Sequence, residues 1–163
     1  QWRPMEPADL PAVERIGGIV HPLFPERPEV PAERLELFPG GCLVAASSMG
    51  PMGYAVAHPW VTGAPPALDV LLGSLPPQAD CLYLHDVALL PQLRGSGLGA
   101  QLVGMLVALA GTRGLARLAL TAVGGSAGYW QRHGFAAWEA GDAALAGKLA
   151  SYGGDAVYMV RPL

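Results

Sequence analysis

Residues 82–106 read LYLHDVALLPQLRGSGLGAQLVGML, and the order of residue types in this stretch predicts the centre of the fold. An apolar run is followed by Pro91, by Arg94 with alternating glycines, and then by apolar residues at helical spacing. We interpret the stretch as a buried strand, a glycine-rich turn and the start of a helix. Backbone N–H groups at a helix N-terminus lack partners within the helix and lie at the positive end of its dipole, so such a turn favours a phosphate ligand.

Two phosphate-binding patterns fit this turn. The dinucleotide fingerprint G-x-G-x-x-G/A is met by Gly95, Gly97 and Ala100. That fingerprint normally opens a domain and is followed about 20 residues later by an acidic residue for the ribose. Here it lies in the middle of the chain, and no Asp or Glu occurs between Asp86 and Glu139. Both facts count against a dinucleotide-dependent enzyme.

The second pattern is R-x-x-G-x-G, met by Arg94, Gly97 and Gly99. It resembles the acetyl-CoA loop of the GNAT (Gcn5-related) N-acyltransferase family. A second predicted strand follows at residues 115–123, and then residues 126–135, SAGYWQRHGF, resemble the family's helix that ends in F-Y-x-x-x-G-F. Two ordered motifs at the family's separation are much more specific than one glycine-rich loop.

The resemblance implies an α/β protein of GNAT fold, with residues 1–163 as a single N-acetyltransferase domain and a mixed central sheet flanked by helices. It also implies that two central strands splay apart, so that the pantetheine of the cofactor pairs with the edge of one strand. The implied activity is transfer of an acetyl group from acetyl-CoA to a primary amine on a small molecule or a peptide N-terminus. Acetyl-CoA would be a co-substrate, and no metal is implied.

Composition agrees with one compact domain, because 52% of the 163 residues are hydrophobic and 14% are charged. The net charge of −3 gives no sign of general affinity for nucleic acid. The charges are unevenly distributed, since residues 87–138 hold four arginines and no acidic residue. A basic centre in an acidic chain suits an anionic ligand such as the CoA pyrophosphate, although arginines such as Arg113 and Arg117 also fit a role as solvated surface residues.

The resemblance assigns the cofactor contacts by position. The backbone of Val87, Ala88 and Leu89 would bond the pantetheine and polarise the acetyl carbonyl. The residues that would wrap the pyrophosphate are Arg94, Gly95, Ser96, Gly97, Leu98, Gly99 and Ala100. An asparagine often found before the family's last helix would fall on Val123, so Ser126 or the nearby glycine backbone is expected to replace its contact.

His85 is the candidate general base, because an imidazole with a pKa near ~6.5 accepts a proton at neutral pH. Its position resembles that of a strand histidine in arylalkylamine N-acetyltransferases; the alternative is a structural histidine bonded to a neighbour. Strand periodicity predicts that Tyr83, His85, Val87 and Leu89 share one face. Asp86 would then point to the other face, with a structural role.

The general acid departs from the family pattern. The family's tyrosine lies four residues before the glycine of the G-F pair, and that position is Trp130, whose indole N–H donates but is not a usable acid. Tyr129 is the catalytic candidate in its place, through a local shift of the helix. The alternatives are a thiolate that leaves unaided, or a non-catalytic CoA-binding domain of GNAT fold that acts as a sensor or partner module.

Other features place weaker limits on function. Cys42 and Cys81 are too few and too far apart for a metal site or a disulfide framework. The sequence shows no signal peptide and no apolar run that could span a bilayer, so we expect a cytoplasmic protein with no membrane partner. His58 is expected in a loop or on the surface. The final strand, at residues 156–161, is one edge on which a homodimer could form.

Overall fold

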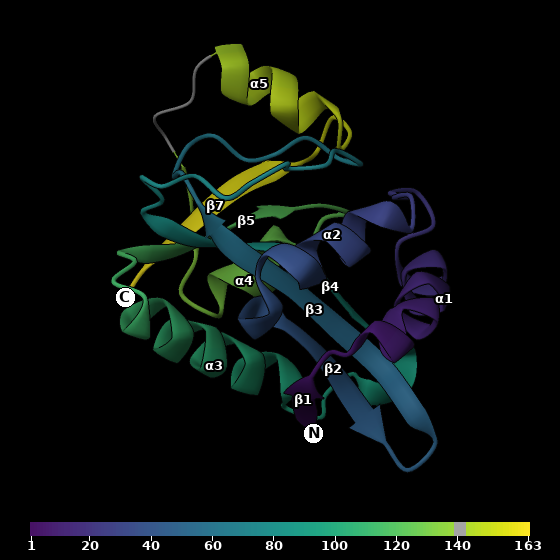
Figure 1. The fold of residues 1–163 in the computed structure, drawn as a ribbon. Helices are drawn as coiled ribbons and strands as arrows, with labels where there is room; N and C mark the ends of the chain where they lie inside the picture. Colours follow the sequence, from purple (N-terminus) through teal and green to yellow (C-terminus); the bar gives the residue numbers. More distant parts are fainter. Residues whose placement is uncertain (139–142) are drawn as a thin grey trace.

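One mixed sheet organises the part of the chain that the computed structural model describes, residues 1–138 and 143–163 (Figure 1). Its strand order is β1-β2-β3-β4-β5-β7-β6. The strands are β1 Trp2–Pro4, β2 Cys42–Ser47, β3 Gly50–Trp60, β4 Cys81–Leu89, β5 Arg117–Ala122, β6 Ala136–Ala137 and β7 Val157–Pro162. Only β4 and β5 run parallel, as a strand–helix–strand crossover requires. The predicted α/β class and mixed sheet are confirmed.

Helices cover both faces of the sheet (Figure 1). Helices α1 and α2 lie on one face, whereas α3 and α4 lie on the other. Helix α5 packs near β7 on the face of α1 and α2, through Leu145 against Tyr158. The bounds are α1 Leu10–Val20, α2 Glu29–Leu37, α3 Leu98–Thr112, α4 Ala127–Gln131 and α5 Ala143–Ala150, with 3-10 turns at Pro7–Asp9, Pro39–Gly41 and Pro91–Leu93.

Alternation along the strands divides the core into two layers. In β2, Cys42 and Val44 face α1 and α2, whereas Leu43 and Ala45 face α3. The strands buried on both faces therefore read as continuous apolar runs, which is why their sequences predicted buried strands. Cys42 and Cys81 are free thiols with no exposed surface.

Three segments differ from what their local sequence favours. Adjacent glycines such as Gly17 and Gly18 favour a helix end, yet α1 continues through them to Val20. The glycines of residues 141–154 favour a loop; residues 141 and 142 lie outside the described part, but residues 143–150 form α5. The apolar residues at 68–72 would suit a short helix, but residues 61–80 connect β3 to β4 through turns.

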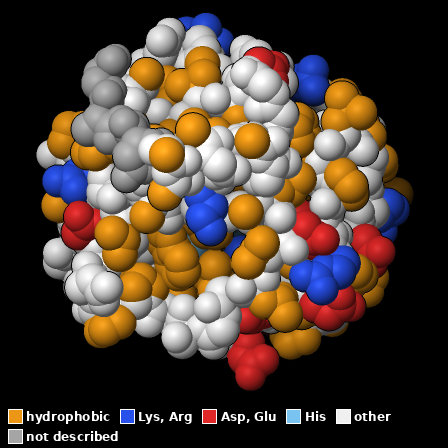
Figure 2. Space-filling view, turned by 90° about the horizontal axis from the view of Figure 1, so that it is seen from above, with side chains coloured by type: hydrophobic (Ala, Val, Ile, Leu, Met, Phe, Trp, Pro, Cys, Tyr) orange, Lys and Arg blue, Asp and Glu red, His pale blue; other side chains and the backbone are white. Residues whose placement is uncertain are grey.

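Charged side chains cover a small part of the face of the molecule that Figure 2 shows. On the face shown in Figure 2, hydrophobic and uncharged atoms predominate and charged side chains are sparse, in keeping with the low charged fraction of the sequence. Within residues 1–138 and 143–163, none of the helices is both long and apolar enough to cross a bilayer. The same residues hold no cluster of three or more His, Cys, Asp or Glu side chains arranged for a metal ion.

Candidate active site

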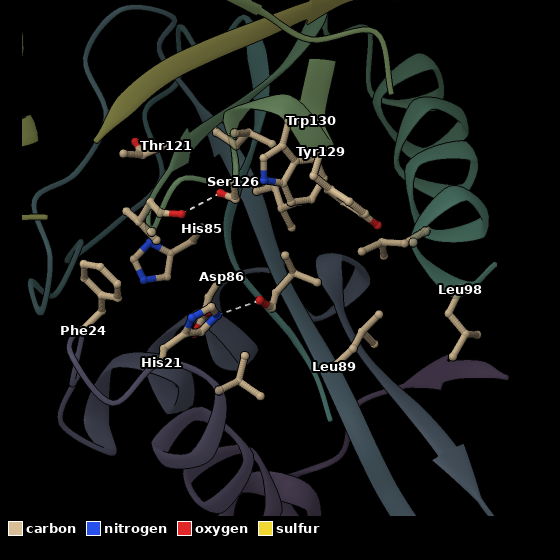
Figure 3. A pocket seen from close by; sticks show the side chains of 18 of the residues that line it. His21, Phe24, His85, Asp86, Leu89, Leu98, Thr121, Ser126, Tyr129 and Trp130 are labelled. Atoms are coloured by element: carbon tan, nitrogen blue, oxygen red, sulfur yellow. Dashed lines mark hydrogen bonds and ion pairs between the residues drawn. The ribbon is translucent and has the colours of Figure 1, made fainter. Parts of the chain in front are cut away.

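A cleft of about 850 Å³ extends from the glycine-rich turn to the loop that joins α1 and α2 (Figure 3). It follows the edge of β4 where that strand leaves β5. The two strands pair only where residues 81–84 meet residues 117–120, and residues 85–89 of β4 have no partner on that side. The splay implied by the family resemblance is therefore present, and it gives the cleft one wall of open strand edge.

His85 is the extra residue of a β-bulge in β4. In the pairing with β3, Asp86 opposes Val56 and Leu84 opposes Ala57, so one residue of β4 is left over between them. A bulge of this kind bends the strand and changes the direction of a side chain. The bend begins where the parallel pairing of β4 with β5 stops, so the bulge and the splay occur at the same residue.

The bulge reverses the side-chain alternation along β4. Leu84 precedes it, Val87 and Leu89 follow it, and all three pack on the face of α3. Tyr83 packs on the opposite face. The prediction that Tyr83, His85, Val87 and Leu89 share one face is therefore wrong, because the inserted residue offsets the period of two.

The glycine-rich turn presents the N-terminus of α3 to the cleft. Gly97 is the residue before the first helical turn; its φ of 83° lies in the left-handed region that glycine adopts without strain, and it has no side chain to cap the helix. The N–H of Leu98 donates to the Ser96 hydroxyl at 3.4 Å. The first N–H groups of α3 consequently have no partner in the helix. Arg94 is exposed beside them and is the single Arg or Lys among the residues that line the cleft.

A histidine–carboxylate pair lies at the other end of the cleft. Nε2 of His85 is 2.8 Å and 3.0 Å from the two carboxylate oxygens of Glu26. A carboxylate only accepts, so this nitrogen carries the proton, and Nδ1 of His85 is buried without a partner. The side chains are 2% and 11% exposed. Burial acts to raise the pKa of Glu26, but the bonds from His85 and from the Asp69 N–H outweigh it and hold that pKa below its ordinary value.

A second polar cluster connects the same loop to β4. Nε2 of His21 donates to the carbonyl of Val87 at 2.8 Å and lies 3.5 Å from Asp86 Oδ1. The hydroxyl of Tyr54 donates to Asp86 Oδ2 at 2.7 Å, and burial raises the pKa of Asp86. Asp86 thus joins β3, β4 and the end of α1. The prediction that it points to the face opposite Tyr83 is wrong, because after the bulge its carboxylate meets Tyr54 and His21 on the side of α1.

The two aromatic residues of α4 point in different directions. Trp130 is buried in the core on the side of α3 and lines the cleft, and Figure 3 shows its indole nitrogen on the cavity side. The hydroxyl of Tyr129 instead lies against the backbone of Gly99, so close that a methyl group on that glycine would overlap it. Tyr129 therefore touches the glycine-rich turn rather than the end of the cleft where His85 lies (Figure 3).

Most of the predicted site residues meet in this cleft. The side chain of Ala88 packs instead among the core residues facing α1. Ser126 donates to the Val123 carbonyl at 2.7 Å. Those that line the cleft are His85, Val87, Leu89, Arg94, Gly95, Ser96, Gly97, Leu98, Gly99, Ala100, Ser126 and Tyr129.

Sequence reasoning missed two features near His85. Glu26 lies in a proline-rich segment 59 residues before its partner, and nothing in its local sequence marks it. The expectation of a loop or surface position for His58 is wrong, because this residue is completely buried in β3. The centroid of its ring lies 6.3 Å from the ring centroid of His85 and 5.7 Å from that of Tyr83. Burial lowers the pKa of His58 to about 3, so it is neutral at pH 7.

A sequence profile of the acetyltransferase (GNAT) family matches residues 13–135 of the chain. The chain belongs to the GNAT family. The match includes both motifs from which the family was suspected and most of the sheet. No curated protein sequence matches the chain.

Solved structures of other GNAT proteins resemble this one over nearly their whole length. A GNAT-like decarboxylase in complex with isobutyryl-CoA has a TM-score of 0.79 at 16% identity, covering 99% of this chain and 98% of that one. The NatC complex bound to Gag peptide and CoA gives 0.73 at 14%, covering 100% and 98%. The ribosomal-protein-S18-alanine N-acetyltransferase from Escherichia coli gives 0.64 at 20%, covering 99% and 92%. At these identities the likeness establishes the GNAT fold.

Proposed function

We propose that this GNAT protein transfers an acetyl group from acetyl-CoA to a primary amine, on a small molecule or a peptide N-terminus. The observation that carries the proposal is the open edge of β4 at the splay, which continues directly into the uncapped N-terminus of α3 in one cleft. A pantetheine arm can pair with the first and a pyrophosphate with the second. CoA in similar GNAT structures, such as the NatC complex, supports the same choice of cofactor.

In the proposed reaction the amine attacks the thioester carbonyl, the C–S bond breaks, and CoA leaves as the thiolate, which takes up a proton from solvent. The backbone N–H of Val87 polarises the carbonyl, and Arg94 with the first turn of α3 holds the pyrophosphate. His85 takes the proton of the ammonium, and Glu26 stabilises the imidazolium that forms. Nδ1 is the nitrogen left for that proton; because it is covered in the free protein, we expect the proton to reach it through water.

Trp130 supports a second candidate function. With an indole where the family has a tyrosine, no hydroxyl of α4 faces His85, and a CoA-binding module without turnover would have no need of an acid there. Such a module would bind acetyl-CoA as a sensor or partner domain.

We also expect a cytoplasmic location, which cell fractionation tests. A homodimer is an open alternative to a monomer, and sedimentation in the analytical ultracentrifuge distinguishes the two.

The first experiment is calorimetric titration of the protein with acetyl-CoA, repeated with Arg94→Ala and Gly97→Val. We expect binding with a Kd on the order of micromolar, weakened at least ~10-fold in each variant by the loss of charge or of the left-handed turn. No binding by the unsubstituted protein would refute the proposal.

An amine panel with His85→Ala as the catalytic control then separates the candidates. Tight binding without CoA release on any amine would favour the non-catalytic module. Malonyl-CoA is tested separately as an alternative to acetyl-CoA, since a GNAT-like decarboxylase is among the similar structures. Release of carbon dioxide from it without acyl transfer would identify a different reaction in the same cleft.

A further inference from the structure

The end of the cleft away from the glycine-rich turn has a distinct chemical character. We call it the acceptor end. Its apolar wall comes from the end of α1, the loop after it and the β3–β4 connection, through Val20, Pro22, Leu23, Phe24 and Leu68. A second cavity of about 370 Å³ adjoins it and shares His21, Phe24, Glu26, His85 and Asp86 with it. Figure 3 shows Phe24 beside His85 and far from Leu98 of the turn.

Glu26 is held in place where the two cavities meet. Its Oε1 and Oε2 accept from His85, and Oε2 also accepts from the backbone N–H of Asp69 at 2.9 Å. A carboxylate has about four acceptor positions, so these bonds leave capacity for one more donor. A fixed carboxylate in a mostly apolar recess is a suitable partner for an ammonium group.

The charged side chains around the acceptor end are mostly acidic. Among the residues that line the two cavities, the carboxylates are Glu14, Glu26 and Asp86, whereas Arg94 is the single Arg or Lys and belongs to the turn at the far end. His21 and His85 direct their Nε2 atoms to protein acceptors. A carboxylate on the acceptor would therefore find no cationic partner.

Two arginines near Glu26 do not change this balance. Arg34 adds positive charge near Glu26 but is completely buried, lines neither cavity and donates to Glu33 and to the Val70 carbonyl. Arg27 is on the surface and paired with Asp69. Nε and Nη2 of Arg34 are buried without a partner, but neither arginine is among the residues that line the two cavities.

We propose that the acceptor is a primary ammonium attached to an uncharged, largely apolar group, and that Glu26 binds this ammonium directly. Free α-amino acids are excluded, because their carboxylate would lie beside Glu26 and Asp86. This inference rests on the proposed acetyl transfer and narrows its substrate class. Both a small apolar amine and an uncharged, apolar peptide N-terminus present this chemistry.

The test uses three acceptors that differ only next to the amine: phenethylamine, phenylalaninamide and phenylalanine. CoA release is measured with acetyl-CoA held at saturation, and a phenylalanine-initiated peptide amide forms the fourth arm. We expect kcat/KM for phenylalanine to be at least ~30-fold below that for the amide, since like charges in a desolvated site repel strongly. The rate with the peptide relative to that with phenethylamine shows whether the acceptor is a peptide N-terminus or a small amine.

The outcomes distinguish the two proposals. If phenylalanine reacts as well as its amide, the inference is overturned while acetyl transfer stands. If acetyl-CoA binds but none of the four acceptors is acetylated, the proposed function fails and the inference falls with it.

Glu26→Gln adds an independent test of the contact. We expect the KM for phenethylamine to rise ~10-fold or more while the KM for acetyl-CoA stays within about 2-fold, because an ion pair is lost at the acceptor end alone. Glu36→Gln, an exposed position on α2, is the matched control and should change neither value. An unchanged amine KM in a folded Glu26→Gln protein would contradict direct binding.

Discussion

His58 is an ionisable side chain kept neutral inside the sheet. Its Nδ1 lies 3.0 Å from the carbonyl of Pro59, and its Nε2 is buried without a partner. In an unfolded chain a histidine has a pKa near ~6.5, whereas burial lowers the pKa of His58 to about 3. Below pH ~6.5 the unfolded state therefore binds a proton that the folded state does not, so stability is full above that pH and is lost progressively towards pH 3.

We predict that His58→Phe weakens this acid sensitivity. Between pH 7.5 and pH 5.0, the free energy of unfolding of the unsubstituted protein should fall by about 2 kcal/mol more than that of the variant. Urea unfolding at the two pH values measures both. Equal losses in the two proteins would mean that His58 titrates normally in the folded state.

Tyr129 and Trp130 can be separated by kinetics. A general acid contributes ~10²-fold or more to kcat, and its loss changes the pH profile. The hydroxyl of Tyr129 lies against Gly99. We therefore expect Tyr129→Phe to alter the KM for acetyl-CoA and to keep kcat within about 3-fold. A large loss of kcat together with a changed alkaline limb would instead support Tyr129 as the acid.

Local sequence indicated the residues proposed for the cofactor better than those proposed for the acceptor. The turn at residues 94–100 is contiguous, so one motif contains the whole element that we propose to bind phosphate. The pair of His85 and Glu26 depends on two segments 59 residues apart, and only tertiary structure brings them together. For the same reason the burial of His58 could not be read from its neighbours.

At the scale of elements, two glycines in different settings should respond oppositely to alanine. Gly104 lies exposed within α3 with open space around its α-carbon, whereas a methyl group on Gly41 would overlap the carbonyl of Ala57 in β3. We expect Gly104→Ala to stabilise the protein by about 0.5–1 kcal/mol through helix propensity. We expect Gly41→Ala to cost about 1–3 kcal/mol because strand and turn must move apart.

Chemical denaturation of both variants against the unsubstituted protein checks this pair. If Gly41→Ala were as stable as the unsubstituted protein, the turn at residues 39–41 would not pack on β3 as described. A destabilised Gly104→Ala would place that residue in a packed interface rather than on the surface.

Element types were predictable from sequence, and their details were not. A bulge depends on how β4 pairs with β3, so the alternation that placed His85 with Tyr83 had no means of detecting it. Helix α1 continues past Gly17 to Val20. A side chain at position 17 would press on the hydroxyl of Tyr54, so this glycine allows close packing and does not end the helix. Helix α5 depends on Leu145 packing in the core near Tyr158, a contact that outweighs the glycines around it.

At the scale of the molecule, the cofactor should bridge the two halves of the splayed sheet. A ligand that binds only the folded state at 100 times its Kd stabilises it by about 2.7 kcal/mol. For a chain of this size that corresponds to a rise in Tm of about 5 to 10 °C. We predict this shift with acetyl-CoA, measured by calorimetry.

Two controls accompany this measurement. Acetyl-CoA should cause no rise in Tm in the Gly97→Val variant, and NAD should cause none in the unsubstituted protein. A shift of equal size with NAD would revive the dinucleotide interpretation of the glycine-rich turn. A full shift in Gly97→Val would mean that the pyrophosphate binds elsewhere.

Because both cysteines are buried, their reactivity measures how often the folded protein opens. Cys42 in β2 and Cys81 in β4 have no exposed surface, and burial raises the pKa of their thiols to about 12 and about 11. A thiol-reactive dye should therefore react with released CoA at once and with the folded protein only as often as the sheet opens. The same reagent thus measures CoA release over minutes. In a sample without substrate, it measures the rate at which the native protein opens and exposes its thiols.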